Sequence, residues 1–231
     1  MRARGVVFDL DGTLVDNMEL HTQAFAGFME RHGRPPLDDA QRGRLDGKRN
    51  TDNFPELFGR DLPREELLAL ADEKEALYRA LSRGRLVPLA GLDRLLNLLA
   101  ESGIRVAVAT SGPADNVRHT LAELGLAGRI TDIVRGDQVP RGKPYPDIFL
   151  AAAAAIGVPP GECLAFEDSP SGVTAARAAG MLCVALTTSF SAEAFRAAGA
   201  APDQLVPDFE AFLAGPMRRL LAASGQSEVV P

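Results

Sequence analysis

Residues 5–16 read GVVFDLDGTLVD and join a short apolar segment to a pair of aspartates. The first four of these residues are apolar and rich in valine, which predicts a strand buried on both faces. Asp9 and Asp11 follow two positions apart, so in an extended chain their side chains point to the same side. Gly12 comes next, where the backbone can turn tightly and approach an anion. Taken alone, this acidic pair fits either a turn cap or a reactive site.

The chain beyond residue 84 alternates between strand-like and helical segments, and glycine follows several of the helical ones. Glycine in that place is a common helix stop. The alternation predicts an α/β fold, a doubly wound, Rossmann-like parallel sheet with helices on both faces. After the first strand, the expected strands are 104–109, 130–134, 163–166 and 182–186, and the expected helices are 92–101, 114–124, 146–156 and 172–179.

Residues 16–84 have a different pattern, in which apolar side chains recur at helical spacing and no strand is evident. We therefore predict a small all-helical cap domain at 16–84, inserted into a core domain formed by 1–15 and 85–231. The cap contains a basic cluster that fits either a solvated surface or a binding site for an anionic substrate: Arg42, Arg44, Lys48 and Arg49. The tail at 224–231 has little to bury, and we predict that it is disordered.

The composition narrows the possible classes of protein. The 231 residues are 46% hydrophobic and 24% charged, with a formal net charge of -6 and no long basic stripe, which argues against nucleic-acid binding. No apolar run reaches the roughly 18 residues of a membrane span, and no secretory signal is evident, so we expect a cytoplasmic protein. Cys163 and Cys183 stand alone in apolar segments, which predicts small buried side chains rather than metal ligands. We expect a monomer or a weak homo-oligomer.

Polar side chains lie just beyond four of the predicted strands. The carboxyl ends of parallel strands share one edge of the sheet, where ligands bind. Alone, the hydroxyl pair and the later acidic pair would fit helix caps, and the lysine would fit a surface position. Together they would bring two hydroxyls, one ammonium and four carboxylates to one crevice: Thr110, Ser111, Lys143, Asp9, Asp11, Glu167 and Asp168.

Crowded carboxylates repel one another, and burying them unpaired is costly. A divalent cation bound between the carboxylates offsets both the repulsion and the cost of burial. An all-oxygen site beside a phosphate group suits Mg²⁺, which keeps some of its waters and takes few protein carboxylates. The sequence therefore predicts a magnesium site at this edge.

Four motifs resemble those of the haloacid dehalogenase superfamily of phosphotransferases, and they occur in that family's order along nearly the whole chain. The first is the stretch from Asp9 to Asp16, DLDGTLVD. The others are Ala109-Thr110-Ser111, Gly142-Lys143-Pro144-Tyr145-Pro146-Asp147-Ile148-Phe149 and Phe166-Glu167-Asp168-Ser169-Pro170-Ser171-Gly172.

The resemblance implies a role for each matching residue. Asp9 would attack phosphorus and form an aspartyl-phosphate, and Asp11 would give a proton to the leaving alcohol and later accept one. Lys143 would add a fixed positive charge beside Asp9. Thr110, with the Ser111 amide, would hold the phosphoryl oxygens.

The resemblance also implies which residues hold Mg²⁺ and which line the substrate site. Asp9, the main-chain carbonyl of Asp11 and Asp168 would hold the ion, with Glu167 either bound directly or behind them. Gly112, next to the hydroxyl motif, would line the substrate site.

Two cap segments are similar to the β-phosphoglucomutase-like branch. His21 stands where a histidine near the hinge assists proton transfer in those enzymes, although a lone helix histidine is more often structural. Gly47-Lys48-Arg49-Asn50 is similar to their substrate-specificity loop. However, the arginine comes two residues after the glycine instead of three, and Gly112-Pro113 stands where a mutase lysine is expected. That lysine helps a sugar bisphosphate bind through its second phosphate, so its absence argues against mutase activity.

We therefore expect a phosphatase that hydrolyses a small phosphomonoester such as a sugar phosphate. A β-phosphoglucomutase-like isomerase is the alternative, because it shares every core residue. A phospho-accepting signalling domain also combines acids, a hydroxyl and a lysine around Mg²⁺. Its acceptor lies on a later strand, however, and it has no cap. A binding protein without catalytic activity is the remaining alternative. All four motifs are complete, however, which argues against it.

Overall fold

The computed structural model describes residues 3–221, and the predicted disordered tail at 224–231 lies outside them. Six parallel strands form one sheet in the order β3-β2-β1-β4-β5-β6. The predicted doubly wound α/β class is confirmed. The strands are β1 Gly5–Phe8, β2 Arg105–Thr110, β3 Asp132–Arg135, β4 Cys163–Glu167, β5 Leu182–Leu186 and β6 Gln204–Val206.

Two strands differ from the expectation by more than one residue at an end. The third was predicted at 130–134, but it begins two residues later, because Ile130 is buried in the turn before the sheet. The edge strand β6 was not predicted at all. It has only three residues, and only Val206 is buried among them, so its pattern is too short to signal a strand.

The strand order reverses beside β1, which pairs with β2 on one side and with β4 on the other. In the register Phe8 lies opposite both Val108 and Phe166. The next residues along these three strands, Asp9, Ala109 and Glu167, therefore end at the same edge. This is the switch point at which open α/β sheets bind ligands.

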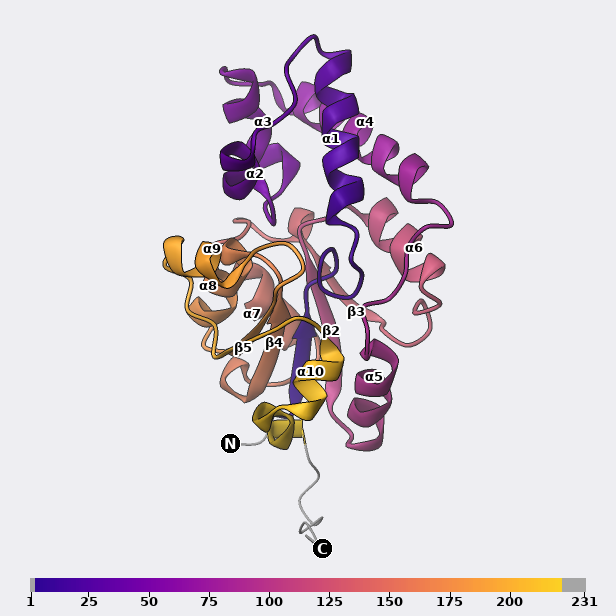
Figure 1. Ribbon diagram of the computed structural model, residues 1–231, viewed down its shortest axis with the longest axis vertical. Helices are drawn as coiled ribbons and strands as arrows, with labels where there is room; N and C mark the ends of the chain where they lie inside the picture. Colours follow the sequence, from indigo (N-terminus) through magenta and orange to yellow (C-terminus); the bar gives the residue numbers. More distant parts are fainter. Residues whose placement is uncertain (1–2, 222–231) are drawn as a thin grey trace, which may run out of the picture.

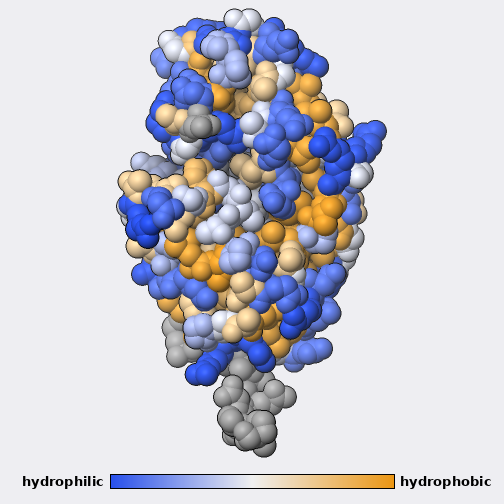
Figure 2. Space-filling model, viewed as in Figure 1, coloured by the Kyte–Doolittle hydropathy of each residue, from blue (hydrophilic) through white to orange (hydrophobic). Residues whose placement is uncertain are grey.

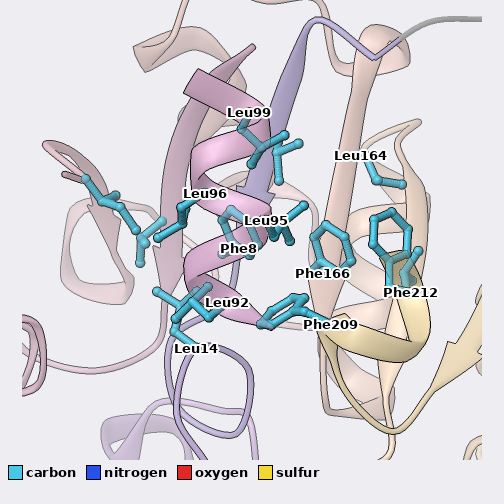
Figure 3. Close-up of a cluster of buried hydrophobic side chains, with 14 of the residues drawn as sticks. Phe8, Leu14, Leu92, Leu95, Leu96, Leu99, Leu164, Phe166, Phe209 and Phe212 are labelled. Carbon is cyan, nitrogen blue, oxygen red and sulfur yellow. The ribbon is translucent and has the colours of Figure 1, made fainter. Parts of the chain in front are cut away.

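The two faces of the sheet carry side chains of different size. One face offers Phe8 and Phe166, which meet Phe209, Phe212 and the leucines of α5 (Figure 3). The other offers mostly alanine and cysteine, which lets alanine-rich helices pack closely. Helices α5 Leu92–Glu101, α6 Ala114–Glu123 and α10 Phe209–Ala214 cover the first face, and α7 Asp147–Ala155, α8 Pro170–Ala178 and α9 Ala192–Ala197 cover the second.

Five helices lie between β1 and β2 in the chain, and the first four of them gather beyond the carboxyl ends of the strands, at the top of Figure 1. Phe28 of this part stacks on Phe54 with ring centroids 5.2 Å apart, within a hydrophobic cluster separate from the sheet. The predicted division at residues 15 and 84 stays a prediction. These four helices are α1 Met18–Arg31, α2 Asp39–Leu45, α3 Asn50–Phe58 and α4 Arg64–Ser82.

On the face drawn in Figure 2, hydrophilic residues cover much of the helical upper part and hydrophobic ones form separate patches. None of the helices within residues 3–221 is both long and apolar enough to span a membrane. Cys163 and Cys183 are buried and unpaired, as predicted.

Candidate active site

Three carboxylates meet beyond the ends of β1 and β4. Asp9, Glu167 and Asp168 are buried, and each offers an oxygen within 4.8 Å of the others. The loop after β3 brings in a buried ammonium, Lys143, whose Nζ donates to Asp9 Oδ1 at 2.5 Å and also to Glu167 Oε1. The structure thus gathers residues from three separate segments of the chain.

The start of α8 holds Glu167 in place. Glu167 Oε2 accepts hydrogen bonds of 2.9 Å from the amides of Asp168 and Ser169 and from the Ser169 hydroxyl. Ser169 also caps α8 through the Gly172 amide at 3.1 Å. With Oε1 bound to Lys143, both Glu167 oxygens are used inside the protein, which favours a supporting position behind the other two acids.

Crowding and burial set the charge of this group. Burial raises the pKa of Asp9 to about 8, with Lys143 opposing the rise and Glu167 adding to it. Burial and the charges of Glu167 and Asp9 raise the pKa of Asp168 well above its usual value. Burial acts to lower the pKa of Lys143, but Asp9 and Glu167 outweigh it and hold that pKa above its ordinary value. One ammonium does not neutralise three carboxylates, so the group has an affinity for further positive charge.

The donor set fits a hard divalent cation, because the three side chains that could hold an ion all offer carboxylate oxygens. Asp9, Asp168 and the carbonyl of Asp11 would hold Mg²⁺, with Glu167 behind them. When bound, the ion would supply positive charge to the oxygens of a transferring phosphoryl group. Gly12 leaves room here: its φ is 76°, and a Cβ at this position would lie 2.0 Å from Asp168 Oδ2.

Magnesium is expected to raise the melting temperature, and to raise it more at pH 8 than at pH 6. The raised pKa values of Asp9 and Asp168 mean that the metal-free fold binds extra protons. Its stability should therefore fall as pH rises from about 4 to about 8. Mg²⁺ needs the ionised carboxylates and competes with those protons. Thermal melts with magnesium, against sodium at equal ionic strength, measure the difference. An equal shift at both pH values would contradict this metal site.

Asp11 faces a different environment from Asp9. Asn17 Nδ2 donates to Asp11 Oδ1 at 2.6 Å, and His21 Nε2 lies 3.5 Å from the same oxygen. Burial pushes the pKa of Asp11 upward, but His21 and Asn17 outweigh it and hold that pKa below its usual value. The structure therefore brings the predicted His21 to the predicted proton-transfer group.

The hydroxyl motif ends β2 at the same edge. Thr110 is 1% exposed, and its Oγ1 accepts a 3.0 Å hydrogen bond from the Gly112 amide. Ser111 Oγ donates at 2.8 Å to the Gly47 carbonyl in the helical part. These residues line a cavity of about 680 Å³, and Asp9, Asp11 and Asp168 line it as well.

The predicted specificity loop closes the other side of this cavity. A Cβ on Gly47, whose φ is 81°, would lie 2.4 Å from Ser169 Oγ, so only glycine allows so close an approach to α8. Asn50 Nδ2 donates to Glu75 of α4 at 2.5 Å. The hydroxyl motif and the second acidic motif are thus in direct contact with the loop between α2 and α3.

The basic cluster is largely neutralised within the helical part. Arg42 pairs with Asp46, and Arg44 pairs with Glu56. Arg49 pairs with Asp52, and its NH1 donates to the carbonyls of Gly136 and Val139 at 3.1 and 3.3 Å. The predicted substrate-binding Arg49 therefore ties the helical part to the segment that follows β3. Lys48 lines the cavity, and no ion pair holds it among residues 3–221.

Sequence reasoning missed several residues around the cavity. Ser189 donates to Asp168 Oδ2 and follows β5, so the rule that located the other strand-end groups could have found it. A group of buried polar side chains in α4 and α6 gave no such signal. Lys74 Nζ is hydrogen-bonded to Glu75 Oε1 and to His21 Nδ1, both at 2.9 Å. Asn116 Nδ2 donates to Glu75 Oε2 at 2.5 Å.

Comparisons with known proteins agree with this geometry. A family model for haloacid dehalogenase-like hydrolases matches residues 3–180. The chain is 35% identical to validoxylamine A 7'-phosphate phosphatase of Streptomyces hygroscopicus subsp. limoneus, over 81% of this chain and 87% of that protein. It is 32% identical to the beta-phosphoglucomutase of Bacillus subtilis, over 78% and 82%. The crystal structure of a hydrolase from Pseudomonas syringae aligns with a TM-score of 0.81 and 28% identity, over 91% and 96% of the chains.

Proposed function

The chain belongs to the haloacid dehalogenase-like hydrolases and is a phosphatase or phosphomutase of that family, and we propose that it is a magnesium-dependent phosphatase acting through an aspartyl-phosphate on Asp9. One observation carries this proposal. The Asp9 carboxylate is bound to Lys143, adjoins two further carboxylates, and borders a cavity that Thr110 and Asp11 also line.

The reaction follows from the roles of two carboxylates. An Asp9 oxygen attacks phosphorus, the bond from phosphorus to the leaving oxygen breaks, and Asp11 gives that oxygen a proton. Water then attacks the aspartyl-phosphate, Asp11 takes a proton from it, and phosphate leaves with Asp9 restored. The lowered pKa of Asp11 suits the second step. The first step gains from the negative phosphoryl group, which raises the pKa of a neighbouring carboxyl.

The substrate class follows from the cavity. About 680 Å³, lined by charged, amide and apolar side chains, suits a small polar metabolite rather than a polymer. The two relatives named above act, by their names, on a phosphorylated small molecule and on a phosphoglucose. We infer a small phosphomonoester such as a sugar phosphate.

Hydrolysis is favoured over isomerisation because a mutase must hold a second phosphate. Arg49, the cap arginine, is already bound to Asp52 and two carbonyls, and Gly112-Pro113 offers no ammonium. One observation favours the mutase alternative: Lys48 lines the cavity without an ion pair among the described residues. A phospho-accepting signalling domain loses its support, because the family match covers the nucleophile and the other three motifs.

The deciding experiment is a screen of phosphorylated metabolites with Mg²⁺ that measures phosphate release. In parallel, β-glucose 1-phosphate is assayed for glucose 6-phosphate. We expect phosphate from one or more sugar phosphates and no glucose 6-phosphate. Glucose 6-phosphate with little free phosphate would reassign the enzyme as a mutase, and no product from any phosphomonoester would overturn the proposal.

A further inference from the structure

A single buried amide, that of Asn17, joins the loop that carries Asp11 to the helical part of the molecule. The side chain is 1% exposed and makes three hydrogen bonds. Its Oδ1 accepts from the Gly12 amide at 3.0 Å, and its Nδ2 donates to Asp11 Oδ1 at 2.6 Å and to the Tyr78 hydroxyl of α4 at 2.5 Å. No sequence motif drew attention to this residue.

Asn17 stands at the N-cap of α1, where asparagine normally accepts a hydrogen bond from its own helix. It makes no such bond here. Several other helices use their N-cap side chains in the usual way, through Asp38, Ser169, Ser191 and Asp208. The Asn17 side chain is therefore committed to Asp11, Gly12 and Tyr78 instead of to its helix.

The three partners also fix which way the amide faces. An amide nitrogen has two hydrogens and no acceptor, and both hydrogens are used. Turning the group over would place Asn17 Oδ1 against the Asp11 carboxylate and its nitrogen against the Gly12 N–H, so both contacts would become repulsive. Tyr78 is itself held, because its ring stacks on His21 with centroids 3.8 Å apart.

Asp11 is left with two unlike oxygens. Oδ1 is bound by Asn17 and lies 3.5 Å from His21 Nε2. Oδ2 lies on the side of the hydroxyl motif: a Cβ placed on Gly112 would be 3.6 Å from this oxygen and 3.3 Å from Thr110 Oγ1. Only Oδ2 is directed toward the loop proposed to hold the phosphoryl group.

We propose that Asn17 is a positioning residue that locks Asp11 so that Oδ2 carries the transferred proton, and that the Tyr78 hydroxyl makes this lock depend on α4. The inference rests on the proposed function, in which Asp11 exchanges that proton with the leaving oxygen and with water. Loss of the amide leaves Asp11 free to rotate about its side-chain bonds, which places its oxygens less often on the reacting atoms. The Gly12 amide is not orphaned by this change, because it also donates to the Val15 carbonyl at 2.8 Å.

The test compares phenyl phosphate with p-nitrophenyl phosphate, which have similar shapes but different leaving groups. Phenolate is basic and needs a proton as it leaves, whereas p-nitrophenolate leaves largely without one. In Asn17→Leu we expect kcat/KM to fall about 30-fold for phenyl phosphate and less than about threefold for p-nitrophenyl phosphate. Tyr78→Phe keeps the stacked ring, and we expect the same split at about fivefold.

Controls separate this effect from simple damage to the fold. Asn53→Leu removes another buried asparagine amide, which donates to the Leu45 carbonyl at 2.9 Å, and should change both substrates alike. Asn17→Ser serves if the leucine variant does not fold. Equal losses on both substrates in Asn17→Ser and Tyr78→Phe, or no loss in either, would overturn the positioning role. Failure of the proposed function itself has a different signature, namely activity that survives Asp9→Asn.

Discussion

Replacing Asp9 with asparagine is expected to lower phosphate release at least about 10⁴-fold, because an amide cannot form the phosphoenzyme. The side chain keeps its shape, so the surrounding packing should survive. Losing a carboxylate whose pKa burial raises to about 8 should even stabilise the metal-free fold at neutral pH. The measurement is steady-state phosphate release with Mg²⁺, together with a thermal melt of each variant.

Two neighbouring variants sharpen this prediction. Asp11→Asn keeps the nucleophile but removes the proton-transfer group, so phosphoenzyme should accumulate and be visible by intact-mass measurement. Asp16→Asn changes an exposed aspartate of the same stretch, and we expect it to cost less than about threefold. Near-normal turnover in Asp9→Asn would refute the nucleophile assignment.

Replacing Lys143 with methionine is expected to have the second-largest effect. The ammonium is 3% exposed and contacts Asp9 and Glu167, so its loss leaves the buried carboxylates without a cation. Breaking a buried pair in this way typically costs about 3–5 kcal/mol of stability. We expect kcat to fall about 10³-fold, because a fixed charge beside the transferring group is lost.

The stability loss in Lys143→Met should depend on pH. Without the ammonium the pKa values of Asp9 and Asp168 rise further above their unfolded values, and stability carried by raised carboxyl groups is lost as pH increases. The melting temperature of the metal-free variant should therefore drop more at pH 8 than at pH 6, and Mg²⁺ should restore part of it. Lys74→Met is a matched control, since that buried ammonium pairs with Glu75 in the helical part. It should destabilise the fold without restoration by Mg²⁺, and the same metal rescue in both variants would argue against the metal site.

The sequence was most informative where chemistry and strand pattern coincide. The apolar run before Asp9 predicted a buried strand, and the acidic, hydroxyl and lysine motifs after the predicted strands are near one another in the structure. This works because strand ends in a parallel sheet share an edge whatever the loops between them do.

Contacts that depend on side-chain direction were not predictable. Asn17 carried no sequence signal, and its bonds to Asp11 and Tyr78 require knowledge of where α4 packs. Arg49 was predicted to bind substrate and lines the cavity, but its hydrogen bonds to carbonyls of a loop about 90 residues further along the chain were not predicted. Edge strand β6 was missed because three residues carry too little pattern to identify a strand.

The central place of β1 has a consequence for how the chain acquires its activity during folding. Its two partners begin at Arg105 and Cys163, so the strand that carries the nucleophile has no local neighbour to pair with. Pairings this distant in sequence slow folding, because large loops must close first. A ribosome-bound fragment that stops before β4 would already contain the reactive aspartates, yet it would lack the remaining acids and half of the supporting sheet. Catalytic competence should therefore emerge late, after most of the polypeptide has been made.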